Sequence, residues 1–261
     1  MVGRRYGPST GTPCSNIELH FSLRALALIW SCPILFMRNS FLKVTFSFLI
    51  GIHLISCASH KTPPYACGPT MNQKGIRSVF KPLIDFMELK PGDTFADVGA
   101  SSGYYTVMMA TLMENTTFYI QDIDTTCLNN REFNKVIDYY SRQSHKELRK
   151  VNSLHYVIGN RGKTNLPENT FDKIYMNATF HALTEPDEMA KDLYERLKSD
   201  GSLFVRDGFP TTKEVQYCAD KNCARPLIPL DTFLTIMARN KFRLEKNLNF
   251  SGYPMYAFKK N

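Results

Sequence analysis

The chain has 261 residues, of which 43% are hydrophobic and 21% charged, with 14 glycines and 14 prolines, so a disordered chain, a collagen-like chain and a disulfide miniprotein are excluded. The formal net charge of +8 is shared equally by two parts of the chain. Residues 1–56 hold five basic residues and one acidic residue, a net charge of +4, and residues 57–261 hold 27 basic and 23 acidic residues, also +4. No basic run or helical stripe is present, so the charge predicts no nucleic-acid partner.

Residues 37–57 have the pattern of a secretory signal. Arg38 and Lys43 precede an apolar stretch, residues 44–55, that is short for a membrane-spanning helix. The stretch ends in Leu-Ile-Ser-Cys, which resembles the lipobox of bacterial lipoproteins. That resemblance implies that Cys57 is lipidated and that the protein is membrane-anchored on the periplasmic side.

This interpretation divides the chain into four parts. Residues 1–36 become a possible mis-called upstream extension with Met37 as the start, 37–57 the signal segment, 58–70 a tether, and 71–261 the folded domain. Three alternatives stay open. Residues 21–36 and 41–56 form two membrane-associated segments, Cys57 belongs to a plain signal anchor, or the apolar stretch occurs by chance on a cytoplasmic protein.

Four cysteines follow Cys57, namely Cys67, Cys127, Cys218 and Cys223. An oxidising compartment could pair this even number. Cys218 and Cys223 share a polar loop, where they are either two free thiols or a local disulfide. No second Cys/His pair accompanies them at metal-ligand spacing, so we predict no metal site.

The domain alternates between helical and strand patterns. The spacing predicts helices over 76–88, with a turn or break at Pro82, and over 104–113, 129–149, 185–197 and 231–240. It predicts strands over 94–98, 118–121, 155–158, 171–177 and 202–206, then two antiparallel strands over 242–250 and 254–259. The expected fold is α/β, a doubly wound three-layer sheet with a C-terminal antiparallel hairpin.

A loop of small residues follows the first strand. It runs from Gly99 to Gly103, between the strand that contains Asp97 and a helix that begins at Tyr104. A dinucleotide fingerprint needs glycine at positions 101 and 104, and a carboxylate at Asp97 would repel two phosphates. An adenosine cofactor with an amino group suits this loop better.

Residues 76–260 resemble class I S-adenosylmethionine-dependent methyltransferases, which have a Rossmann-like fold. The family's first motif, hD-x-G-x-G-x-G, matches around Asp97, with Ser101 in place of the middle glycine. The turn L-K-P-G-D precedes it. Further along, residues 166–172 resemble L-P-x-x-x-F-D and residues 177–183 resemble N-x-x-x-H-x-L.

The resemblance implies S-adenosyl-L-methionine as the cofactor. Asp122 corresponds to the acid that accepts both ribose hydroxyls, with Asp124 as the fallback, and Asn160 to the residue beside the adenine amino group. Alternatively, Gly99 and Gly103 are plain turn glycines and Asp122 is a helix N-cap. The full set of expected cofactor-binding residues is Asp97, Gly99, Ala100, Ser101, Gly103, Tyr104, Asp122, Ile123, Asn160 and Asn177.

Methyl transfer requires mainly that the protein align donor and acceptor and exclude water. Over the ends of the fourth and fifth strands, His181 and Asp207 are the evident proton acceptors, and we predict them as catalytic residues. His181 is alternatively a packing residue at a helix start. The loop over residues 208–229 is expected to cover or shape the acceptor pocket.

Two functions of different class remain. The first is a methyltransferase that acts on a small-molecule acceptor. The second is a lipid-anchored, methyltransferase-like protein that binds a ligand without catalysis. An export signal favours this second function, because S-adenosylmethionine is made in the cytosol. Aminopropyl transfer and a nucleotide-linked oxidoreductase are remoter alternatives.

Overall fold

The structure, a computed structural model, describes residues 64–211, 216, 226–250 and 252–261. These residues belong to one compact unit, Lys61–Asn261, and a second unit, Met1–His60, lies outside them. The predicted signal segment with Cys57 also lies outside the described residues, as do Cys218 and Cys223, so the predictions made for them stay predictions. Within the described part of the chain, none of the helices combines the length and apolarity needed to cross a bilayer.

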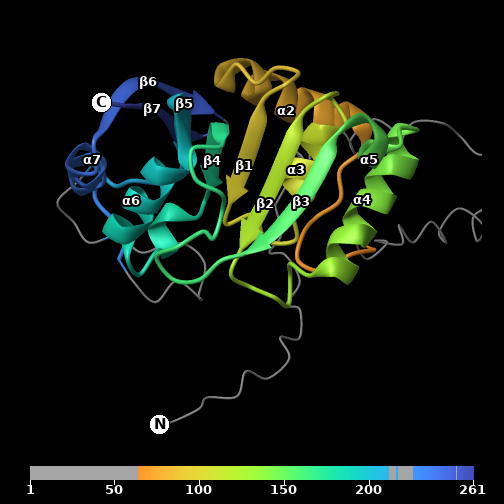
Figure 1. Cartoon of the computed structure of the whole chain (residues 1–261), viewed down its shortest axis with the longest axis horizontal. Helices are drawn as coiled ribbons and strands as arrows, with labels where there is room; N and C mark the ends of the chain where they lie inside the picture. The colour runs from red at the N-terminus through yellow and green to blue at the C-terminus, as the bar shows by residue number, and fades with distance from the viewer. Residues whose placement is uncertain (1–63, 212–215, 217–225, 251) are drawn as a thin grey trace, which may run out of the picture. The chain divides into compact units, whose positions relative to one another are not determined.

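Seven strands form one sheet in the order β3-β2-β1-β4-β5-β7-β6 (Figure 1). The first five strands in this order are parallel, and β7 runs antiparallel to both β5 and β6. The predicted α/β fold with a C-terminal antiparallel hairpin is therefore confirmed. The strands are β1 (Thr94–Val98), β2 (Thr117–Asp122), β3 (Ser153–Ile158), β4 (Phe171–Asn177), β5 (Leu197–Arg206), β6 (Phe242–Phe250) and β7 (Tyr253–Lys260).

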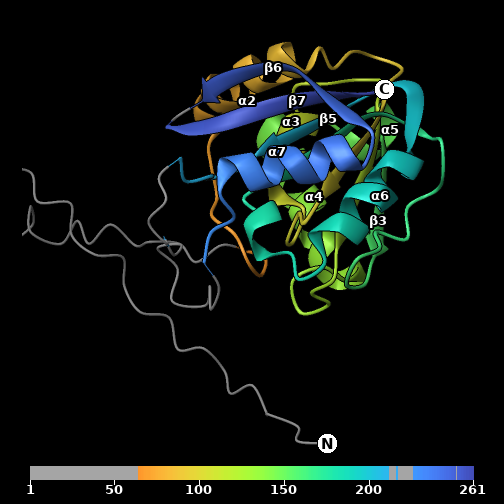
Figure 2. The same cartoon turned by 90° about the vertical axis from the view of Figure 1, so that its left-hand side faces the viewer.

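Helices cover both faces of the sheet, which makes three layers. Helices α2, α3 and α4 lie on one face and α6 and α7 on the other (Figure 2). The helical elements are α2 (Gln73–Met87), α3 (Tyr104–Ala110), α4 (Asn130–Ser144), α5 (Leu148–Val151), the short 3-10 helix η1 (Phe180–Ala182), α6 (Pro186–Arg196) and α7 (Leu230–Arg239).

The central strands are apolar on both sides, as a doubly covered parallel sheet requires. Phe95 belongs to the core under α2, α3 and α4, whereas Ala96 and Val98 belong to the core under α6 and α7. Successive side chains of a strand point to opposite faces, so β1 contributes to both cores. This burial fixes the strand and, with it, the loop that follows Val98.

Helix α3 ends at Ala110, three residues before its predicted end, and α2 and α4 differ from the sequence-based expectation in other ways. Helix α2 continues through Pro82 without a break, because Pro82 is exposed and the opposite side of the helix is anchored by buried residues such as Phe80 and Leu83. Helix α4 ends earlier than predicted, at Ser144, where His145 adopts a left-handed conformation with φ 55°. The remaining predicted span is a turn and the short helix α5.

The strand order reverses direction between β1 and β4. The chain moves outward from β1 to β2 and β3, then returns to β4 on the other side of β1. In open α/β sheets the crevice at the carboxyl ends of such a pair of strands binds the ligand. The sequence-predicted site residues lie at or just after the carboxyl ends of β1, β2, β3, β4 and β5, so the topology brings them to this one edge.

Candidate functional site

The loop after β1 approaches its neighbours closely. The backbone N–H groups of Gly99 and Ala100 both donate to the carbonyl oxygen of Gln121, at 2.9 and 3.0 Å. Gly99 has φ +77°, and a Cβ placed on it would lie 2.2 Å from Cγ2 of Thr179, in the loop after β4. Both observations require glycine at this position.

The middle of the same loop is held by a carboxylate. The backbone N–H of Ser101 donates to Oδ2 of Asp122 at 2.6 Å, and Ser101 itself is left-handed with φ 53°. This is the position where the resembling family has glycine, so the serine occupies a backbone conformation that favours glycine. Gly103 caps α3 with φ 81°, and a Cβ there would lie 2.8 Å from Ile120.

A cavity of about 400 Å³ opens at the switch point, within the usual size range of small-molecule sites. Its lining includes Gly99, Asp122, Ile123, Asn160 and Thr179. The Ile123 side chain is 54% exposed, which leaves an apolar surface at the edge of the cavity.

Asp122 and Asp124 have different surroundings. Asp122 lines the cavity, and its Oδ1 accepts the backbone N–H of Asp124 at 2.9 Å. The carboxylate of Asp124 instead accepts the backbone N–H and the hydroxyl of Thr126, at 2.8 and 2.6 Å, which caps a turn. Since only Asp122 lines the cavity, Asp122 is better placed than Asp124 to meet a ligand there.

Asp97 lies at the end of β1 in a buried position. Burial raises the pKa of the Asp97 carboxyl group to about 7. The hydroxyl of Thr106 donates a hydrogen bond to this carboxyl group and opposes the rise, whereas the nearby carboxylate of Asp122 adds to the rise. A buried carboxyl with a pKa near neutrality is typical of functional sites. An ammonium group arriving beside it would favour the ionised form.

A second cavity of about 210 Å³ lies across the end of β4, between α2 and the carboxyl ends of β4 and β5. The predicted cofactor residue Asn177 lines this second cavity and not the first. Its Oδ1 accepts from Nη1 of Arg206 at 2.8 Å and from the hydroxyl of Tyr175 at 3.2 Å. The lining is mostly apolar, with Met71, Val79, Phe80, Leu83, Tyr105, Tyr175, Asn177 and Arg206.

The predicted catalytic residues His181 and Asp207 are paired. Nδ1 of His181 lies 2.9 Å from Oδ1 of Asp207, and the backbone N–H of His181 donates to Oδ2 at 3.0 Å. Asp207 is buried, and its Oδ1 also accepts the backbone N–H of Gly208 at 2.8 Å. The carboxylate therefore fixes the orientation of the imidazole ring, although His181 is in the lining of neither cavity.

The structure sorts the ten expected cofactor residues into groups. Gly99, Asp122, Ile123 and Asn160 share the larger cavity, and Asn177 lines the smaller one. The other five lie at the end of β1, in the loop after it or at the start of α3, outside both linings, namely Asp97, Ala100, Ser101, Gly103 and Tyr104. Among the residues that the structure describes, no three His, Cys, Asp or Glu side chains gather as metal ligands.

Sequence reasoning missed three contributors. Thr179 packs on Gly99, Arg206 joins Asn177 in the second cavity, and Cys67 contacts the loop after β1. Thr179 lies at an unspecified position of the motif over residues 177–183, and Arg206 ends a predicted strand just before Asp207, so neither carries a signal of its own. Cys67 lay in the predicted tether. The only sign of its role was that an even number of cysteines follows Cys57, which is compatible with disulfide pairing.

Comparison with known proteins shows what the domain is similar to. Residues 96–205 match a family described as a methyltransferase domain. Ubiquinone/menaquinone biosynthesis C-methyltransferases from two strains of Vibrio cholerae are 26% identical over 133 residues, which is 50% of this chain and 47% of each relative. The chain thus spans about half the length of these curated relatives.

Solved structures share the fold at low sequence identity. An S-adenosylmethionine-dependent methyltransferase from Aquifex aeolicus is 18% identical with a TM-score of 0.52, over 72% of this chain and 97% of that one. The cyclase SpnF is 13% identical with a TM-score of 0.55, over 84% and 94%. An N-methyltransferase from Haemonchus contortus in complex with S-adenosylhomocysteine is 14% identical with a TM-score of 0.51, over 72% and 57%.

The fold is therefore the Rossmann-like fold of class I S-adenosylmethionine-dependent methyltransferases. The family match supports the predicted enzyme class and S-adenosylmethionine as its cofactor.

The close approach at Gly99 gives a testable prediction. Gly99→Ala places a methyl group against Thr179 at the edge of the larger cavity, so we expect the Kd for S-adenosylhomocysteine to rise by about tenfold or more. Gly92→Ala is the matched control. Gly92 also has a positive φ, +91°, but nothing lies within 4 Å of its Cβ. Both variants carry a similar backbone strain of roughly 1 kcal/mol. Titration calorimetry of both variants checks this, and equal affinities would contradict it.

Proposed function

We propose that the protein transfers the methyl group of S-adenosylmethionine to a small organic acceptor. The observation that carries this proposal is the cavity at the switch point. Its lining combines a backbone without a side chain at Gly99, a carboxylate at Asp122 and an exposed apolar residue at Ile123. These are the features that an adenosine group needs. The similarity to C-methyltransferases of ubiquinone/menaquinone biosynthesis favours a small-molecule acceptor.

In this proposal the larger cavity holds the adenosine part of the cofactor. The Asp122 carboxylate keeps lone pairs beyond those used by Ser101 and Asp124, so it can also accept two ribose hydroxyls. Ile123 offers its exposed side chain to the adenine face, and Asn160 lies at the same cavity as a polar partner for the adenine edge. Asp97, which lies in β1 two residues before Gly99, is the carboxyl group that we propose to balance the ammonium charge.

The second cavity is the proposed acceptor site. It meets the end of β4 at Asn177, and the next residues of the chain, Ala178 and Thr179, line the cofactor cavity. A bound acceptor and donor would therefore face one another across the end of one strand. The mostly apolar lining favours an acceptor with an apolar body, and Arg206 with Asn177 supplies polar contacts at one end.

When bound, S-adenosylmethionine supplies a methyl group on a sulfonium, which leaves without help from an acid. The protein's part is to align the acceptor atom and to exclude water. His181, oriented by Asp207, stays the predicted base for an acceptor that arrives protonated, although it lines neither the second cavity nor the larger one. The buried carboxylate of Asp207 stabilises the imidazolium that results.

Cofactor binding tests the first step. We expect the full chain to bind S-adenosylhomocysteine in titration calorimetry, and Asp122→Asn to raise the Kd by about tenfold or more because one charged acceptor is lost. Asp124→Asn is the control, since its carboxylate caps a turn and does not line the cavity. Absence of binding by folded protein at millimolar ligand would rule the function out.

The raised pKa of Asp97 predicts a pH dependence of binding. Its carboxyl is largely protonated below pH 7 in the folded apo-protein, and only the ionised form attracts the ligand's ammonium group. We therefore expect the Kd for S-adenosylhomocysteine to rise by about tenfold between pH 8 and pH 6. Asp97→Asn should bind more weakly with a flat profile. A steep profile in that variant would assign the titration to another group.

Turnover tests the acceptor site. Val79 lines the second cavity from α2 and is only partly buried, so Val79→Phe fills the cavity without disturbing the sheet. With an acceptor found by screening apolar phenols, amines and carboxylic acids for S-adenosylhomocysteine release, we expect kcat/KM to fall by about tenfold or more. S-adenosylhomocysteine affinity should stay unchanged, and Val79→Ala is the matched control. Unchanged kcat/KM in Val79→Phe would show that the acceptor binds outside this cavity.

Cofactor binding without turnover of any acceptor would favour the alternative that the protein binds its ligand without catalysis.

A further inference from the structure

A short segment before α2 lies across the cofactor loop. We call this segment, residues 65–69, the strap. Its first residue, Tyr65, is buried, and its hydroxyl lies 2.9 Å from that of Tyr140 on α4 and donates to the carbonyl of Pro69 at 2.6 Å. The backbone N–H of Ala66 donates to the buried carboxylate of Glu132, also on α4, at 3.0 Å. The strap is thus attached to α4 at one end.

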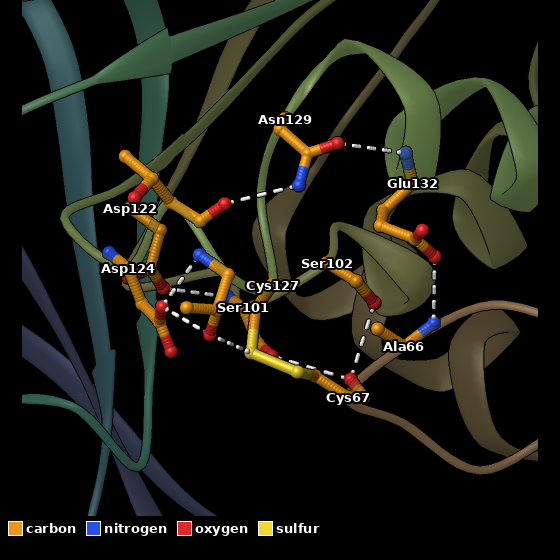
Figure 3. The surroundings of a disulfide bond; sticks show 11 residues. Ala66, Cys67, Ser101, Ser102, Asp122, Asp124, Cys127, Asn129 and Glu132 are labelled. Carbon is orange, nitrogen blue, oxygen red and sulfur yellow. Dashed lines mark hydrogen bonds between the residues drawn. A yellow bond between two sulfur atoms is a disulfide. The ribbon is translucent and has the colours of Figure 1, made fainter. Parts of the chain in front are cut away.

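A disulfide attaches the strap to the loop between β2 and α4. Cys67 and Cys127 are bonded, with 5.5 Å between their Cα atoms and a sequence separation of 60. The β2–α4 loop is the one that begins after Asp122, and the backbone N–H of Cys127 donates to the carbonyl of Asp124 at 3.2 Å. Figure 3 shows the sulfur–sulfur bond next to Asp122, Asp124 and Ser101.

The strap also bonds to the loop after β1. The carbonyl oxygen of Cys67 accepts the hydroxyls of Ser101 and Ser102, at 3.2 and 3.1 Å (Figure 3). Gly68 lies on the ring of Tyr104, where a Cβ would come within 2.4 Å of Cδ1. The strap therefore joins both loops that frame the proposed cofactor site, the β2–α4 loop through the disulfide and the loop after β1 through hydrogen bonds.

Removing the disulfide would leave the strap weakly held. Between the buried Tyr65 and helix α2, the segment is half-buried or exposed. Exposed segments with few buried contacts have low local stability. Cys67 is exposed and Cys127 is buried, so a reductant in solution would approach the bond from the side of Cys67.

We infer that Cys67 and Cys127 are positioning residues whose disulfide sets the affinity of the cofactor site. Reduction by a dithiol transfers two electrons and two protons to the sulfur–sulfur bond, which gives two cysteine thiols and the oxidised, cyclic form of the reductant. The strap then leaves Ser101 and Ser102, and the loop after β1 loses the order that cofactor binding needs. This inference rests on the proposed cofactor site.

The test compares S-adenosylhomocysteine binding by the oxidised and the reduced full chain. With dithiothreitol as the reductant, we expect the Kd to rise by about tenfold, within the usual range of coupling between two sites. Circular dichroism must show that the reduced protein stays folded at the titration temperature. The Cys67→Ser/Cys127→Ser double variant should bind as the reduced protein does and should not respond to dithiothreitol. The Cys218→Ser/Cys223→Ser double variant should respond as the unmodified chain does.

A second variant separates positioning from general stability. Ser102→Ala removes a hydrogen bond to Cys67 without touching the disulfide. We expect it to weaken binding in the oxidised protein and to change little in the reduced protein, where the strap has already left, so the two effects are not additive. Equal affinity of folded oxidised and reduced protein would overturn the inference while leaving the proposed function intact. Failure of the oxidised protein to bind would overturn both.

Discussion

The site depends on one constraint, the fastening of the loop after β1 to the strands on both of its sides. Gln121 accepts its first two backbone N–H groups, Asp122 accepts the N–H of Ser101, and the hydroxyl of Thr179 donates to the carbonyl of Gly99 at 3.3 Å. These bonds come from β2 on one side and from the loop after β4 on the other. They are possible because parallel strands of a buried sheet end together at one edge. The two cavities lie at this edge, and the larger one is lined from β2, from the fastened loop at Gly99 and from the loop after β4.

The fold followed closely from the sequence because its signals are local. Residues 94–98 and 171–177 form strands with the predicted bounds, since apolar runs between turn residues leave little choice of structure. The break predicted at Pro82 was wrong, because a proline on the exposed side of a helix is tolerated when buried residues on the other side hold it. The class of cofactor was available from motif spacing. The partner of Cys67 was not, because pairing depends on which loops the sheet brings together.

The carboxyl groups show the limit of sequence reasoning at the site. Spacing alone left Asp122 and Asp124 as alternatives for the ribose. The structure separates their surroundings, because only Asp122 lines the cavity while Asp124 caps the turn at Thr126. Asn177 carried a motif signal yet lines the second cavity, where Arg206 donates to it. A motif can locate a polar residue in the sequence. Which of the two cavities its side chain lines depends on how the strands and helices pack.

The departure at Ser101 and the disulfide have one explanation. Glycine at this position would satisfy the left-handed backbone without strain, whereas serine occupies it at φ 53° and gains a hydroxyl that donates to Cys67. Disulfides persist in oxidising compartments, which is also where the predicted lipoprotein signal would direct the chain. Serine at this position and the cysteine pair therefore both fit the proposal of a cofactor loop that is braced from outside the motif.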